Sequence, residues 1–159
     1  MQKDVPFKND VEQAVKEYAD MLFRICIAVL KNEADAQDAV QETFLKYIQK
    51  APQFENGQHE KAWLIRVATN CSRNMLKKKS RYSDMSKQSV AADRFDEETA
   101  FVFDALVSIP EKFSVVIVLH YIEGYKVDEI AGMIGKTPSA VKMRLQKGRK
   151  LLEKAYGEE

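Results

Sequence analysis

The stretch from residue 127 to residue 152 constrains the fold most, because it has the marks of two helices joined by a tight turn. Its first half has an apolar face at helical spacing, made by Ile130, Ala131 and Ile134. Gly135 then offers a residue that tolerates positive φ at a helix end, and Thr137 and Pro138 offer an N-cap and a first helical residue. The pattern predicts a helix-turn-helix.

The second helix of this motif has two faces of different chemistry. Its inner face is formed by Val141, Leu145, Gly148 and Leu152. The residues expected to contact DNA are Thr137, Ser139, Lys142, Met143, Arg144, Gln146 and Lys147. Residues 138–154 hold six basic residues against one acidic residue, a net charge of +5. This excess favours a helix that enters the major groove of DNA over an αα-hairpin whose lysines merely face water.

Charges are segregated along the rest of the chain, although the net charge of its 159 residues is only +1. Residues 1–60 hold 7 basic and 11 acidic residues, whereas residues 61–81 hold 7 basic residues and none that is acidic. Residues 82–106 hold 2 basic and 6 acidic residues. The neutral total therefore conceals two basic patches, one in the middle and one at the C-terminus.

Helical periodicity predicts an all-α chain made of two small domains. The expected helices of the N-terminal domain, residues 1–79, cover residues 10–30, 33–50 and 60–79, with a loop at 53–59. Residues 80–96 are rich in serine and are predicted to form a flexible linker. The C-terminal domain, residues 97–159, is expected to be a winged-helix-like bundle that ends in the helix-turn-helix.

A basic stripe follows the third expected helix opposite its apolar face. It consists of Arg66, Asn70, Arg73 and Lys77, which are spaced four, three and four residues apart. Trp63 falls beside this stripe. A basic groove with an aromatic or amide platform suits single-stranded nucleic acid. The alternatives are that the stripe is an ordinary solvated face and that Trp63 is a core residue that orients the helix.

Other features exclude several classes of function. Cys26 and Cys71 lie on apolar helix faces, which predicts buried free thiols and a cytoplasmic location. His59 and His120 have no partner at zinc-ligand spacing, and the sequence has no nucleophile–base pair or phosphate loop. We therefore expect no metal, no cofactor and no enzymatic activity. The longest apolar run, residues 25–30, is too short to span a membrane, so no membrane insertion is predicted.

Three motifs follow one another along the chain. They are DAVQETF at residues 38–44, AWLIRVATN at 62–70, and a run from IPEK at 109–112 through EIA at 129–131 to VKMRL at 141–145. Together they resemble bacterial RNA polymerase sigma factors of the extracytoplasmic-function (ECF) group of the sigma-70 family. The resemblance covers nearly the whole chain and implies a non-catalytic subunit for transcription initiation. The implied partners are the β′ and β subunits of the polymerase core, promoter DNA and an anti-sigma factor.

The resemblance also implies roles for particular residues. The first motif would bind the polymerase core through Asp38, Gln41, Glu42 and Phe44. The second motif and the loop before it would capture and melt the downstream, minus-ten promoter element through Phe54, Asn56, Trp63, Arg66, Asn70, Arg73 and Lys77. The third motif would read the upstream, minus-thirty-five element with the helix-turn-helix. Met143, Gln146 and Gly148 depart from the residues common in the family at these positions, which leaves the promoter sequence open.

A second hypothesis is a DNA-binding regulator that acts without polymerase. Residues 1–79 would then form a ligand-binding or dimerisation domain. Such a protein would bind duplex sites by itself as a dimer, with half-sites spaced by the symmetry of the pair.

Overall fold

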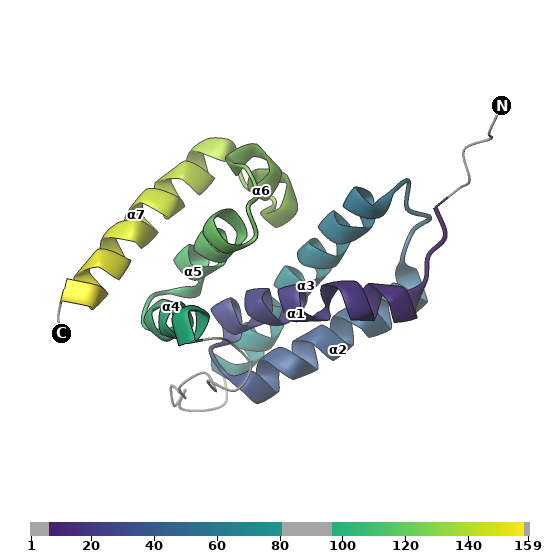
Figure 1. The fold of residues 1–159 in the computed structure, drawn as a ribbon, viewed down its shortest axis with the longest axis horizontal. Helices are drawn as coiled ribbons and strands as arrows, with labels where there is room; N and C mark the ends of the chain where they lie inside the picture. Colours follow the sequence, from purple (N-terminus) through teal and green to yellow (C-terminus); the bar gives the residue numbers. More distant parts are fainter. Residues whose placement is uncertain (1–6, 81–96, 158–159) are drawn as a thin grey trace.

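The computed structural model describes residues 7–80 and 97–157, and within these ranges the chain forms helices and no strand. Figure 1 shows two groups of helices that pack side by side. The predicted all-α class is confirmed, and most of the predicted linker lies outside the described residues. None of the helices in these ranges is long and apolar enough to cross a membrane.

The N-terminal helical group consists of α1 (Val11–Leu30), α2 (Glu33–Lys50) and α3 (Gly57–Ser80), which pack on one another. Side-chain caps set the start of the first two helices, as the sequence predicted for α2. The Gln13 backbone amide donates to the Asp10 carboxylate at 3.2 Å, and the Asp35 amide donates to the Asn32 side chain at 2.9 Å. The predicted ranges of α1 and α2 are therefore confirmed to within one residue.

The start of α3 differs from the prediction, since the helix begins at Gly57 instead of residue 60. The Asn56 side chain accepts a hydrogen bond of 2.8 Å from the His59 backbone amide. The Asn56-Gly57 pair is thus a helix cap and a first helical residue, where the sequence suggested a loop turn. Asparagine and glycine are common both in turns and at helix starts, so the local sequence does not distinguish a turn from a helix start here.

The C-terminal helical group consists of five elements in chain order: α4 (Glu97–Val107), α5 (Glu111–Ile117), the π-helical turn η2 (Val118–Ile122), α6 (Val127–Ile134) and α7 (Pro138–Gly157). The last two helices form the predicted helix-turn-helix. Gly135 has a φ of 69° at the end of α6, and the Thr137 hydroxyl accepts from the Ala140 backbone amide at 3.1 Å. The glycine and the cap therefore both act as the sequence predicted.

Both cysteines are buried and free, as predicted: Cys26 in α1 and Cys71 in α3. Burial raises the pKa of the Cys26 thiol to about 12, because a thiolate there would lose its hydration. At physiological pH this thiol is protonated, and a protonated thiol is a poor nucleophile and metal ligand.

Gly148 of α7 packs tightly against α5. A Cβ atom at this position would lie 2.6 Å from Ile117 Cδ1 and 3.3 Å from Phe113 Cβ. Gly148→Leu is therefore expected to lower the free energy of unfolding by about 1–3 kcal/mol through overpacking. The matched control is Gly132→Ala in α6, where a Cβ would meet nothing within 4 Å, and there we expect a gain of about 0.5–1 kcal/mol. Thermal melting of both variants measures the difference, and equal stability of Gly148→Leu and wild type would contradict close packing at this site.

The two helical groups contact each other along α1 and α3. The first of these helices packs against α2 and α3 within its own group and also against α4, α5 and η2 of the C-terminal group. The second packs against α6. In Figure 1 the C-terminal group accordingly lies to the left, next to the C-terminal end of α1 and beside α3. The surfaces predicted to bind DNA are thus parts of one compact arrangement.

Candidate functional site

The basic stripe of α3 lies on one face of the helix, as its spacing predicted. Arg66, Asn70 and Lys77 are exposed. Arg73 is half-buried and forms an ion pair with Glu111 of α5, with 3.7 Å between Nε and Oε2. Three members of the stripe thus face solvent, and the fourth faces the C-terminal helical group.

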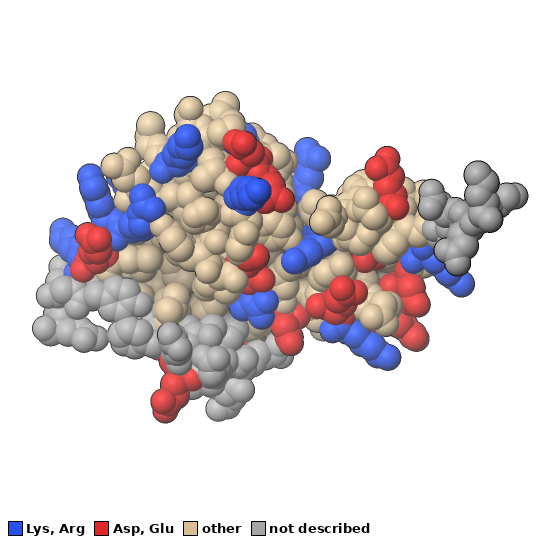
Figure 2. Space-filling view, turned by 45° about the horizontal axis from the view of Figure 1, so that its top comes forward, with Lys and Arg blue, Asp and Glu red and all other residues tan. Residues whose placement is uncertain are grey.

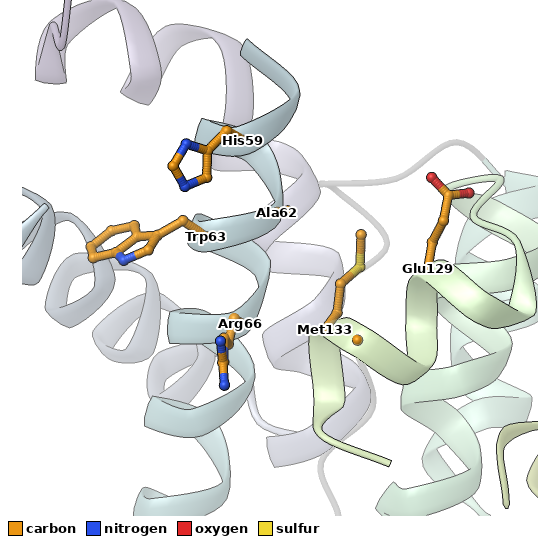
Figure 3. Close-up of a pocket in the computed structure, with 7 residues that line it drawn as sticks. His59, Ala62, Trp63, Arg66, Glu129 and Met133 are labelled. Carbon is orange, nitrogen blue, oxygen red and sulfur yellow. The ribbon is translucent and has the colours of Figure 1, made fainter. Parts of the chain in front are cut away.

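Trp63 is half-buried beside this stripe. Its ring lies edge-on to Phe54, with 5.6 Å between ring centroids, and edge-on to Tyr47, with 6.0 Å between centroids. This packing favours a tryptophan that orients α3, while its outer part remains accessible. Trp63 also borders a hollow of about 390 Å³ between α3 and α6. Figure 3 shows the lining side chains on the two helices: His59, Ala62, Trp63 and Arg66 on α3, and Glu129, Gly132 and Met133 on α6.

Phe54 requires a correction, because the resemblance implied that it would contact the downstream promoter element. Its side chain is only 1% exposed and packs between Tyr47 and Trp63. Asn56 is used by the start of α3, as described above. The segment before α3 therefore anchors the helix through a buried aromatic ring and offers no Phe54 surface to DNA.

Glu60 is a positioning residue that sequence reasoning missed. Its carboxylate is buried, with 5% of the residue exposed, and accepts a hydrogen bond of 2.7 Å from the Tyr47 hydroxyl. Burial, together with this bond, raises the pKa of Tyr47, so the hydroxyl stays protonated and continues to donate. The bond joins the end of α2 to the start of α3 and fixes the direction of the stripe. The bond joins residues 13 positions apart, so no local pattern in the sequence indicates it.

The predicted polymerase-binding patch on α2 is exposed at Asp38, Gln41 and Glu42. The same helix face continues with Leu45 and Ile48, which are 47% and 66% exposed. Ile48 is thus a surface residue, although its apolar side chain falls at helical spacing after the buried Phe44. A hollow of about 380 Å³ lies at the acidic end of this face, between α2 and α3.

Phe44, which the resemblance assigns to the polymerase-binding motif, is a buried residue. It is 8% exposed and belongs to the core of the N-terminal helical group. Its role in a polymerase contact can therefore only be to hold α2 in place beneath the exposed patch. The period of the helix predicts this burial, since Phe44 lies about two turns after the buried Ala36 and one turn after the half-buried Val40.

The outer face of α7 is exposed where the sequence predicted DNA contacts. Exposed residues are Thr137, Ser139, Lys142, Met143, Gln146 and Lys147, and Arg144 is half-buried. Lys112 of α5 joins this face: its ammonium and that of Lys147 lie 5.1 and 5.8 Å from the centroid of the Phe113 ring. These two cations and Arg144 surround a hollow of about 410 Å³. Lys112 was missed because it lies far from α7 in the sequence.

Basic side chains are visible on the side of the molecule that bears the C-terminal helices. In Figure 2 the side that bears the C-terminal helices shows several Lys and Arg side chains, whereas Asp and Glu side chains stand among Lys and Arg toward the end near the N-terminus.

Two family models match the chain, each on one helical group. Sigma-70 region 2 matches residues 14–82, and Sigma-70 region 4 matches residues 102–152. Both matches fall where the motifs of the sequence lie. They cover the α3 stripe, the α2 patch and the helix-turn-helix.

Curated relatives extend over most of the chain. The ECF RNA polymerase sigma factor SigE of Mycolicibacterium smegmatis is 27% identical over 89% of this chain, which spans only 59% of that relative's length. RNA polymerase sigma factor SigV of Bacillus subtilis is 24% identical over 96% of this chain and 94% of its own. SigW, also an ECF sigma factor of Bacillus subtilis, is 28% identical over 86% of this chain and 83% of its own.

Solved structures share the fold of both helical groups. RpoE of Bartonella quintana, solved in complex with the anti-sigma factor NepR, covers 92% of this chain with a TM-score of 0.79 at 21% identity, and 96% of that chain is matched. CnrH, solved with the cytosolic domain of CnrY, covers 94% of this chain with a TM-score of 0.68 at 25% identity, and 88% of that chain is matched.

Proposed function

Since the chain belongs to the sigma-70 family, in its extracytoplasmic-function group, we propose that it binds the RNA polymerase core and directs it to particular promoters. The observation that supports this most is the order of the two family regions on two helical groups, each with its own basic surface. Sigma factors are DNA-binding initiation factors and are not themselves catalytic. The protein would supply promoter recognition to an enzyme that lacks it.

The two helical groups would act as separate domains on the promoter. The C-terminal domain would place α7 in the major groove of the upstream element, with its N-terminal half at the base edges. The N-terminal domain would hold melted downstream bases against Trp63, Arg66 and Asn70. Stacking of a base on an aromatic ring is worth about 1–3 kcal/mol, which is comparable to the few kcal/mol that unstacking costs. Two or three captured bases would therefore suffice to keep the strand open.

The α2 patch would bind the polymerase, through its β′ or β subunit. Exposed Leu45 and Ile48 beside Asp38, Gln41 and Glu42 combine an apolar centre with a charged rim, which is typical of protein interfaces. An anti-sigma factor is a further partner, because related folds were solved with NepR and with CnrY. The place of action would be the cytoplasm, where the polymerase is.

Substitutions at two residues of α7 distinguish contacts to the DNA phosphates from contacts to the bases. Lys142→Ala should weaken binding to every upstream element and flatten the salt dependence of binding, because it removes one phosphate contact. Gln146→Ala should change preference at one base pair, by about 1–3 kcal/mol if the amide makes a bidentate contact. Selection from a randomised promoter pool at two salt concentrations distinguishes the two effects. An unchanged selection with both variants would contradict the placement of α7 in the groove.

The alternative of an independent regulator is tested by binding alone. The chain is mixed with a purified bacterial polymerase core and, separately, with duplex DNA from the same randomised pool. Co-elution with the core in gel filtration, together with weak binding to duplex DNA alone, supports the sigma function. Tight and specific duplex binding without the core, by a dimer, would support the regulator and contradict the proposal.

A further inference from the structure

The segment before α1 lies against the connection between α2 and α3 and is joined to it by hydrogen bonds. The Asn9 side chain donates from Nδ2 to the backbone carbonyl of Pro52 at 2.8 Å, and its Oδ1 accepts from the Phe54 backbone amide at 3.5 Å. The Gln53 side chain donates from Nε2 to the backbone carbonyl of Phe7. Because an asparagine amide both donates and accepts, one side chain serves two backbone groups of the connection.

An aromatic contact adds to these hydrogen bonds. The Phe7 ring lies edge-on to the Phe54 ring, with 6.4 Å between centroids. On its other sides the Phe54 ring contacts His59 and Trp63 of α3, with 5.1 and 5.6 Å between ring centroids. Edge-on pairs are favourable because the positive edge of one ring meets the negative face of the other. Phe54 therefore links the segment before α1 to the aromatic side chains at the start of α3.

Residues 7–10 act as a strap, because both ends of this segment are fixed. At one end are the contacts of Phe7 and Asn9 to the connection. At the other end Asp10 caps α1, which packs on α2 and α3. The connection itself, residues 51–56, forms neither helix nor strand. Its position therefore depends on contacts with other segments, and the strap supplies several of them.

We propose that the strap positions Trp63 for melted downstream DNA, and that Asn9 is the positioning residue that holds the strap on the connection. This inference rests on the proposed role of α3 in capturing the downstream element. Phe54 supports the inner part of the Trp63 ring, and the outer part stays accessible to a base. A ring whose orientation is fixed in advance binds a base more tightly, because less freedom is lost on binding.

Removal of the strap contacts tests the proposal. Asn9→Ala removes both hydrogen bonds of the side chain, and Phe7→Ala combined with Asn9→Ala also removes the ring that lies against Phe54. The matched control is Gln13→Ala, which removes an exposed amide from the first turn of α1 and keeps the backbone amide that Asp10 caps. None of these substitutions changes the net charge, so the electrostatic part of DNA binding stays the same.

The first measurement is tryptophan fluorescence of the full-length chain without DNA. Trp63 is the only tryptophan of the chain, so its emission reports the surroundings of this one ring. Asn9→Ala should shift the emission to longer wavelength and increase quenching by acrylamide, because the ring becomes more exposed to water, and the double variant should do so more strongly. Gln13→Ala should match wild type. A strap that only stabilised the fold would lower the melting temperature and leave the emission of the folded chain unchanged.

The second measurement is promoter opening by each variant together with the polymerase core. If Trp63 is correctly placed in only a fraction of the molecules, the apparent affinity for the melted strand falls by that fraction. We expect the double variant to form about three- to tenfold less open complex, measured by permanganate reactivity on a linear template. Recruitment to duplex promoter DNA should equal that of wild type and of Gln13→Ala.

Each outcome decides one part of the proposal, and circular dichroism first establishes that the helices of every variant persist. Shifted emission together with less open complex in the strap variants supports it. Unchanged emission of a folded double variant overturns the role of the strap at Trp63. Shifted emission with full promoter opening overturns the link to DNA, because a displaced ring then makes no difference. Failure of the wild-type chain to open promoters would contradict the proposed function instead, and the emission would still show whether the strap holds the ring.

Discussion

Asp38→Lys combined with Glu42→Lys is expected to abolish co-purification with the polymerase core while the chain stays folded. Both carboxylates are exposed on α2, so neither is needed by the core of the protein, and surface substitutions usually change stability by no more than about 0.5 kcal/mol. Like charges that face each other across an interface cost several kcal/mol. The matching surface of the polymerase should therefore be basic.

The control for this prediction is an equal change of charge elsewhere. Glu12→Lys with Asp20→Lys alters two exposed positions of α1 and should leave the pull-down intact. Thermal melting and pull-down are measured on the same preparation. A folded Asp38→Lys, Glu42→Lys chain that still co-purifies with the core would remove α2 from the polymerase interface.

Arg66→Ala combined with Asn70→Ala is expected to impair open-complex formation by about tenfold or more, since a hydrogen bond contributes about 0.5–1.5 kcal/mol and one from a charged group about 1.5–3 kcal/mol. Both side chains are exposed on α3, so their loss should not disturb packing. Arg73 is a poorer choice because its ion pair with Glu111 of α5 would mix the loss of DNA binding with a loss of packing between the helical groups. Initial recruitment to duplex DNA should change little.

Permanganate footprinting on a linear template measures this effect. A pre-melted bubble template then distinguishes weaker capture of the melted strand from weaker melting. If the double variant loses as much activity on the bubble as on the linear template, capture of the single strand is lost. Full activity of the double variant on both templates would leave the stripe as an ordinary solvated face.

Much of the fold is predictable because its signals are local. Asn32, Gly135 and Thr137 each act within a few residues of their own position, so the starts of α2 and α7 and the turn between α6 and α7 follow from the sequence. The Asn56-Gly57 pair shows the limit of such signals. The same two residues suit a turn and a helix start, and in the structure they start α3.

The candidate site is less predictable because its critical contacts are long-range. Periodicity places the α3 stripe on one face but cannot tell that Glu111 pairs with Arg73 or that Glu123 pairs with Arg24. Periodicity alone also fails to predict which apolar side chains are buried. Ile48 has an apolar side chain at helical spacing and is nevertheless 66% exposed, because the neighbouring helices already cover the rest of α2.

The most direct test of the sigma function is transcription by a reconstituted enzyme. The chain is added to a polymerase core free of other sigma factors, on a library of randomised promoters, and the transcripts are sequenced. We expect transcripts only when both components are present, from templates that share one upstream and one downstream element, and none with the Asp38→Lys, Glu42→Lys chain. Transcription that is equally random with and without the chain would contradict the proposed function.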